Sequence, residues 1–143
     1  MNGFDGEAGL VYDLYQDVEV PIGTIQADLM FDDRIQYDSL GYASSLPRIY
    51  EAAIEDPNGV TLAPIVREEI LLNGRSYTDT GWRHRSVSIA PFAGQTVRIH
   101  IHESIPETYT GPASIEFDGF RIDAQVLPEW LAVEPATATI PPA

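Results

Sequence analysis

Apolar and polar residues alternate along the first part of the chain with a period of two. From position 10 to position 20, one face carries Leu10, Tyr12, Leu14, Gln16, Val18 and Val20, and the other carries Asp13, Tyr15, Asp17 and Glu19. This pattern predicts a half-buried strand that ends at Pro21. A second alternation follows a short turn, with Ile25, Ala27, Leu29 and Phe31 expected to face inward. A loop rich in Ser, Gly and Tyr is expected over 38–47.

The middle of the chain predicts a hairpin. A short strand is expected over 49–54, and the residues Asp56-Pro57-Asn58-Gly59 come soon after it. Proline fixes φ and Asn-Gly accepts positive φ, so these four residues predict a tight turn. Residues 60–62 are then expected to return as the second strand. The segment 65–72 fits either an irregular strand or a short helical turn.

The region from Trp82 to Ile122 repeats the order strand, turn, strand. Val87 and Ile89 share one face, residues 91–94 form a turn, and Val97, Ile99 and Ile101 alternate again. The last apolar residues change phase: Ile115 and Phe117 are odd-numbered, whereas Phe120 and Ile122 are even-numbered. Because this change falls at Asp118-Gly119, it predicts a β-bulge.

About seven short strands separated by turn residues predict an all-β fold, an antiparallel β-sandwich or jelly roll. The expected domain covers residues 1–125. Residues 126–143 differ in character, because they are rich in proline and small residues and carry no basic side chain. They are expected to form a linker or the first strand of a following domain.

Charge and composition narrow the possible functions. The 143 residues include 22 acidic and eight basic ones, every basic one an arginine, and the net charge is −14. A field of this sign repels phosphate, so neither nucleic acid nor an anionic lipid surface is expected as a partner. No apolar run approaches the roughly 18 residues that a membrane-spanning helix needs. The lack of cysteine removes disulfides, thiolate metal sites and cysteine catalysis.

Catalytic chemistry has little support in the sequence. No Gly-x-Ser-x-Gly elbow is present to support a serine nucleophile. Two carboxylates at the spacing of a glycoside hydrolase would arise by chance among so many acidic residues. No catalytic residues are therefore predicted, and the chain is not expected to be an enzyme.

Six segments carry a likeness to a known family. They are Asn2–Gly6, Tyr15–Pro21, Ala27–Phe31, Gly81-Trp82 with Val87–Ile89, Phe92–Val97 and Glu116–Phe120. In this order and spacing they resemble the galactose-binding-like jelly-roll modules, a group that includes many carbohydrate-binding modules and MAM-like domains. The residues Pro128–Pro135 resemble the first strand of bacterial immunoglobulin-like repeats. Together these likenesses imply a multidomain parent that is secreted or lies at the cell surface.

The same resemblance implies a structural calcium between the N-terminal segment and the closing strand. Asp5, Glu7 and Asp118 would be the candidate ligands, since calcium takes six to eight oxygen atoms. The family often has two adjacent acids in the closing strand, and here the second position is Gly119. The alternative is that these acids form part of a solvated acidic surface.

The three histidines raise a second metal hypothesis. His100 and His102 are two apart on a predicted strand and therefore share a face. If segments 82–89 and 95–103 pair as a hairpin around Gly94, His84 falls near His102, and three imidazoles have the donor set for zinc. The alternatives are that the two strands lie in different sheets, and that the histidines are solvated and paired with Glu103 or Glu116. The solvated arrangement is favoured.

Aromatic residues are the best ligand candidates. Tyr42, Tyr77 and Tyr109 fall in predicted loops with Gly and Ser, and sugar rings stack on such side chains. Trp82 is instead expected to fill the core. The sequence thus predicts a noncatalytic extracellular binding module that recognises carbohydrate. The alternative is a structural or adhesive protein-interaction module without a sugar site.

Overall fold

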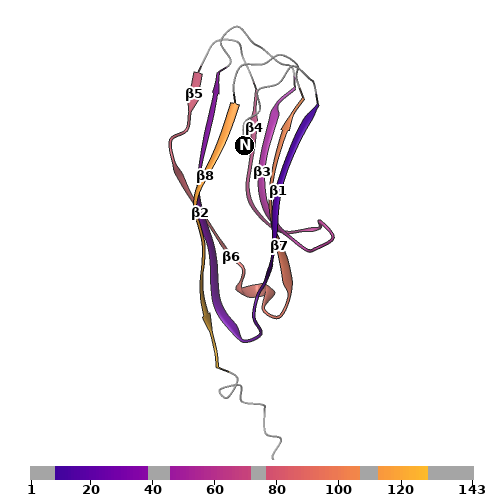
Figure 1. Ribbon diagram of the computed structural model, residues 1–143, viewed down its shortest axis with the longest axis vertical. Coiled ribbons are helices and arrows are strands. Elements are labelled where there is room, and N and C mark those ends of the chain that lie inside the picture. Colours follow the sequence, from indigo (N-terminus) through magenta and orange to yellow (C-terminus); the bar gives the residue numbers. More distant parts are fainter. Residues whose placement is uncertain (1–8, 39–45, 72–76, 107–112, 129–143) are drawn as a thin grey trace, which may run out of the picture.

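The computed structural model describes residues 9–38, 46–71, 77–106 and 113–128, which form two antiparallel sheets packed face to face (Figure 1). One sheet has the order β1-β7-β3-β4, formed by β1 (Leu10–Glu19), β7 (Thr96–Ile105), β3 (Arg48–Glu55) and β4 (Thr61–Ile70). In the other, β2 (Thr24–Asp38) pairs with β8 (Ala113–Val126), β5 (Tyr77–Asp79) and β6 (Arg83–Ser88). A short 3-10 helix, η1 (Ala90–Phe92), connects β6 to β7. The predicted all-β antiparallel sandwich is confirmed.

The core lies between the two sheets and follows the predicted alternation. Its buried apolar side chains include Leu29, Phe31 and Ile35 of β2, Tyr50, Ala52 and Ile54 of β3, and Val97 and Ile101 of β7. Ile25 was predicted to face inward with them, but it is exposed. The reason is a register shift against β8 between Thr24 and Gln26, which takes Ile25 out of the alternation.

The hairpin of β3 and β4 is confirmed, and its turn is held by Asp56. The Asp56 carboxylate accepts hydrogen bonds from the backbone N–H groups of Asn58 (2.8 Å) and Val60 (2.9 Å). The segment beyond it is one continuous strand, so the helical-turn alternative for 65–72 is wrong for the described residues up to 71. Pro64 is tolerated there because β4 is an edge strand, which needs no amide on its outer side.

A buried ionic network joins the sheets on one flank of the sandwich. Asp33 of β2 is fully buried and accepts hydrogen bonds from Arg83 Nε (2.9 Å) and Arg85 Nε (2.7 Å) of β6. Both guanidinium groups also reach Glu68 of β4, at 2.8 and 3.1 Å. The hydroxyl group of Tyr50 donates a hydrogen bond to Asp33. The pKa of Tyr50 is raised, mainly by burial and next by the negative charge of Asp33. This flank is therefore closed by charge pairs.

Trp82 does not fill the core, so that prediction was wrong. Its side chain is 52% exposed. The reason lies in the phase of β6, where Arg83, Arg85 and Val87 are the more buried residues. Because side chains alternate along a strand, this phase turns Trp82 outward together with His84.

Candidate functional site

The flank opposite the ionic network is open. Among the described residues, β1 pairs only with β7 and β8 pairs only with β2, so each strand keeps one backbone edge without a partner strand. These two edges face each other at the near side of the sandwich in Figure 1. Free strand edges are templates for the addition of another strand.

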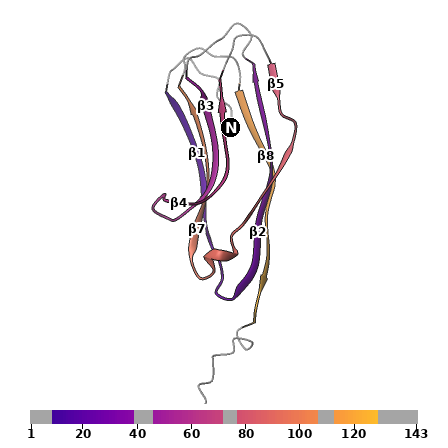
Figure 2. The same ribbon diagram turned by 180° about the vertical axis from the view of Figure 1, so that it is seen from behind.

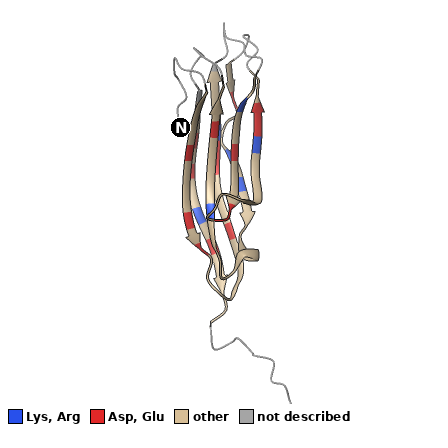
Figure 3. Cartoon of the chain, turned by 90° about the vertical axis from the view of Figure 1, so that its right-hand side faces the viewer, with Lys and Arg blue, Asp and Glu red and all other residues tan. Residues whose placement is uncertain are grey.

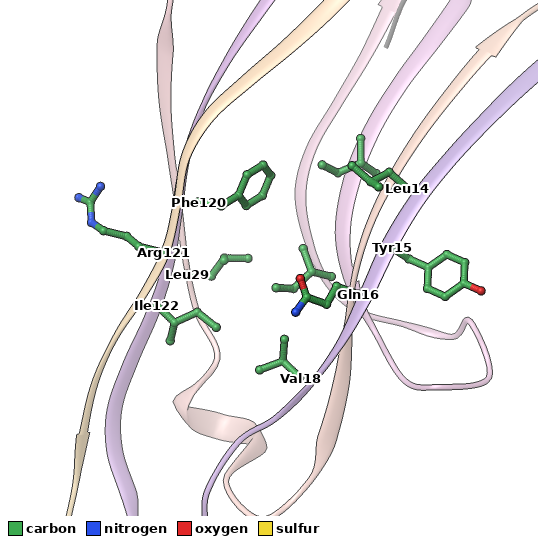
Figure 4. A pocket seen from close by; sticks show the side chains of 10 residues that line it. Leu14, Tyr15, Gln16, Val18, Leu29, Phe120, Arg121 and Ile122 are labelled. Carbon is green, nitrogen blue, oxygen red and sulfur yellow. The ribbon is translucent and has the colours of Figure 1, made fainter.

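An apolar groove lies between the two edges, and we call it the flank groove. Its volume is about 410 Å³. It is lined by Leu14, Tyr15, Gln16 and Val18 of β1, Leu29 of β2, Ile99 and Ile101 of β7, and Phe120, Arg121 and Ile122 of β8. In Figure 4 the side chains of Leu14, Val18, Phe120 and Ile122 point into this space, while Tyr15 and Arg121 point away from it.

The bulge predicted at Gly119 is confirmed, and it shapes one wall of the groove. The register between β2 and β8 shifts between Met30 and Asp32, and Gly119 has a φ of +65°. The extra residue resets the alternation of β8, so that Phe120 and Ile122 face inward. Phe120 stacks on the buried Phe31 ring with centroids 4.7 Å apart.

The inward-facing residues of the groove are far less buried than a core requires. Leu14 is 52% exposed, Phe120 44% and Ile122 37%, because no described strand covers them. On the outer face of β1, where Tyr15 points, Arg98 lies over the Tyr15 ring at 4.2 Å and forms an ion pair with Asp17 at 2.7 Å. An exposed apolar surface bordered by polar residues is typical of an interaction site.

Of the three tyrosines predicted to bind ligand, the structure describes one. Tyr77 opens β5, opposite Asp38 of β2, and is 57% exposed. It does not line the flank groove. Tyr42 and Tyr109 lie outside the described residues, so the structure neither gathers nor separates the three. Their role in ligand binding stays a prediction.

Asp118 is the one predicted calcium ligand that the structure describes. It is exposed on β8, opposite Asp32 of β2, and its Oδ1 accepts a hydrogen bond from the Gly119 amide at 2.7 Å. Asp5 and Glu7 lie outside the described residues. The calcium site therefore stays a prediction too.

The histidines do not form the three-imidazole cluster considered from the sequence. His84 lies on β6, which pairs with β2, while His100 and His102 lie on β7 in the other sheet. The hairpin of 82–89 with 95–103 is thus wrong, because η1 carries the chain from one sheet to the other. His84 contacts Asp32, His100 contacts Asp13 and Glu55, and His102 contacts Asp13.

Comparison with known proteins leaves the family open. No protein-family profile matches the chain, and neither a curated protein nor a solved structure is detectably similar to it. Within the described part of the chain, no helix has the length and hydropathy that crossing a membrane requires.

Sequence reasoning missed the flank groove, although several of its apolar residues were recognised as part of alternating strands. Leu14 and Val18 alternate as inward residues, and Phe120 and Ile122 follow the predicted bulge. What the sequence did not indicate is that β1 and β8 would both be edge strands on the same flank. The one available signal was the bulge, since bulges are frequent at sheet edges and near binding sites.

Proposed function

We propose that this chain is a noncatalytic interaction module that docks an extended segment of a partner protein in the flank groove. One observation carries the proposal: inward-facing apolar side chains are left half exposed between two strand edges that lack a partner strand in the described structure. An added strand would bury these side chains and bond with a free edge in the same step.

Strand addition explains both features of the flank. Backbone hydrogen bonds to a free sheet edge supply affinity, and pockets for alternate side chains supply specificity. The groove volume of about 410 Å³ lies within the range of about 300–1,000 Å³ that is usual for binding pockets. Burying a fully exposed leucine or isoleucine side chain is worth roughly 1.5–3 kcal/mol, and covering the exposed parts of Leu14 and Ile122 would add a fraction of that for each.

Charge complementarity indicates the chemistry of the partner. The chain carries a net charge of −14, although Asp13, Asp17 and Asp123 on the outward faces of the edge strands already contact histidine or arginine side chains. Opposite charges across an interface increase the association rate and exclude wrong partners. The occupant is therefore proposed to be an extended peptide segment with apolar residues on one face and Lys or Arg on the other.

This function is the protein-interaction alternative of the sequence analysis. Carbohydrate recognition stays a hypothesis, because two of its three tyrosines lie outside the described residues and Tyr77 lies apart from the groove. Membership of the galactose-binding-like family is likewise a proposal, supported by the antiparallel sandwich and by the likeness of the six sequence segments.

Selection from a displayed library of random ten-residue peptides tests the proposal. We expect the selected peptides to alternate apolar residues with others and to be enriched in Lys and Arg. Leu14→Asp places a charge in the groove and should weaken the selected peptides by at least about tenfold, a loss of about 1.4 kcal/mol. Val60→Asp is the matched control, because Val60 is similarly exposed but lies in the turn between β3 and β4.

Three outcomes would contradict the proposal. The first is that no peptide is enriched, and the second is that Leu14→Asp and Val60→Asp weaken peptide binding equally. The third is that a second copy of the chain already fills the groove. The last is detected by sedimentation velocity as a dimer that Ile122→Asp, on the opposite wall, dissociates.

A further inference from the structure

Three metal-ligating groups meet on the outer face of the β1-β7-β3-β4 sheet, away from the flank groove. Asp13 of β1 is the register partner of His102 on β7, and His100 lies two residues before His102 on the same face. Asp13 Oδ1 is 2.9 Å from His100 Nε2 and 2.8 Å from His102 Nδ1. One donor atom from each of the three residues lies within 4.8 Å of the other two.

A fourth residue, on the neighbouring strand β3, orients the ring of His100. Glu55 of β3 has its Oε1 2.9 Å from His100 Nδ1, and its side chain is only 12% exposed. Glu55 accepts the Nδ1 proton of His100 and thereby directs Nε2 towards Asp13. Histidines that bind metals almost always donate their second ring N–H to such a carboxylate or carbonyl group.

The surroundings of the cluster leave room for an ion with an open coordination position. A hollow of about 260 Å³ lies beside the two histidines, lined also by Glu51, Ala53, Glu55 and Thr61. Ala53 is the register partner of His100, and its small side chain leaves this space free. The connection between β3 and β4, which leads into β4 at Thr61, projects from the sheet (Figure 2). Acidic positions recur along the strands of this face and attract cations (Figure 3).

We propose that Asp13, His100 and His102 bind a divalent transition-metal ion, with zinc the best match. Two imidazoles and one carboxylate are the donor set of open zinc sites, whereas calcium and magnesium prefer oxygen ligands alone. In a tetrahedral site with bonds near 2 Å, ligand atoms stand about 3.3 Å apart. The two spacings from Asp13, 2.9 and 2.8 Å, need to widen by a few tenths of an ångström, and the two histidine nitrogens, which lie within 4.8 Å of each other, need to settle near the same separation.

The fold already gathers the ligands of the site. Asp13 Oδ1 contacts both His100 Nε2 and His102 Nδ1, so the three side chains converge on one point. Since the ligands come from two strands and Glu55 from a third, the bound ion also ties β1 to the rest of its sheet.

Titration calorimetry of the chelator-treated chain with zinc chloride tests the site. We expect one zinc ion per chain, a rise of the thermal midpoint with zinc, and no comparable rise with calcium or magnesium chloride. His102→Gln should abolish this binding, and Glu55→Gln should weaken it by about 10–100-fold, as expected for a positioning residue. His84→Gln is the matched control, because His84 also contacts a carboxylate but lies on the other sheet.

Cobalt substitution distinguishes a built site from loose attraction to the acidic surface. The parent chain should give the intense visible absorption of tetrahedral cobalt, and Glu55→Gln should shift it. Asp13→Asn provides a second test should His102→Gln fail to fold, because Asp13 lies at a sheet edge. The proposal is overturned if zinc binding is absent, if several ions bind with equal strength, or if His84→Gln lowers affinity as much as the cluster variants.

Discussion

The hydroxyl group of Tyr50 on β3 lies 3.0 Å from Oδ2 of Asp33 on β2 and donates a hydrogen bond across the interior of the sandwich. Both side chains are fully buried. The same carboxylate faces the guanidinium groups of Arg83 and Arg85. Its charge is thus balanced inside the protein, and one residue links the two sheets on the closed flank.

Removal of this carboxylate should be among the most damaging single changes in the chain. Asp33→Ala leaves two guanidinium groups without their buried partner, which we expect to cost about 3–5 kcal/mol of unfolding free energy. Tyr50→Phe removes only the hydrogen bond and should cost about 1.5–3 kcal/mol. Urea unfolding at neutral pH, followed by circular dichroism, measures both. The assignment of the network is wrong if Asp33→Ala proves the milder variant.

Trp82 should contribute little to stability, in contrast to the role first expected for it. Trp82→Ala is predicted to change the unfolding free energy by about 1 kcal/mol or less, because the side chain is 52% exposed. Tyr50→Ala should cost about 3–5 kcal/mol, as large-to-small changes in a core do. The same urea titrations compare the two. Equal losses would show that Trp82 is buried in solution.

The strands were predictable because the period of two is a local property of the sequence. The alternations around Leu14, Leu29 and Ile99 each gave a correct strand, and Gly119 gave the bulge. The inward orientation of Arg83 and Arg85 was not predictable, because a charged side chain in an alternating pattern indicates the solvent face. Only the fold brings Asp33 beside them and makes their inward position favourable.

The pairing of the strands could not be predicted from the sequence, and neither could the two candidate sites that depend on it. Residues 83–88 and 96–105 follow each other closely, which favours a hairpin, yet η1 sends them to different sheets. The side chain that joins His100 and His102 is consequently that of Asp13, from a strand more than eighty residues away in the sequence (|i−j| = 87 from His100). Antiparallel partners all satisfy the same alternation, so the pattern carries no information on which strands meet.

Gly119 should be needed for its backbone conformation. At a φ of +65° an alanine is strained, and we expect Gly119→Ala to cost about 1–2 kcal/mol. A Cβ atom there would lie 3.6 Å from Asp32 Oδ2, an ordinary contact, so crowding adds nothing. Gly119→Asn should cost less, since asparagine tolerates positive φ. Urea unfolding ranks the three chains, and an alanine variant as stable as the parent would refute the argument.

Asp79 should give the protein part of its resistance to acid. Its carboxylate accepts hydrogen bonds from Arg34 Nε (2.9 Å) and Nη2 (2.6 Å), and from the Gly81 amide (2.9 Å). The bonds from Arg34, followed by that from Gly81, hold the pKa of Asp79 well below its ordinary value of 3.8. The folded state therefore favours the ionised form, and this contribution is complete only above the unfolded pKa.

The sign of the pH dependence follows directly. Asp79→Asn should be less stable than the parent at pH 7, and the difference should shrink as the pH falls below about 3.8, where the parent's unfolded state takes up the proton first. Urea titrations of both chains at a series of pH values between 7 and 2 measure this difference. Because both chains share all the other carboxylates, the contributions of those groups cancel in the difference. A gap that stays constant with pH would mean that the Arg34–Asp79 contact, which fastens β5 to β2, is not formed in solution.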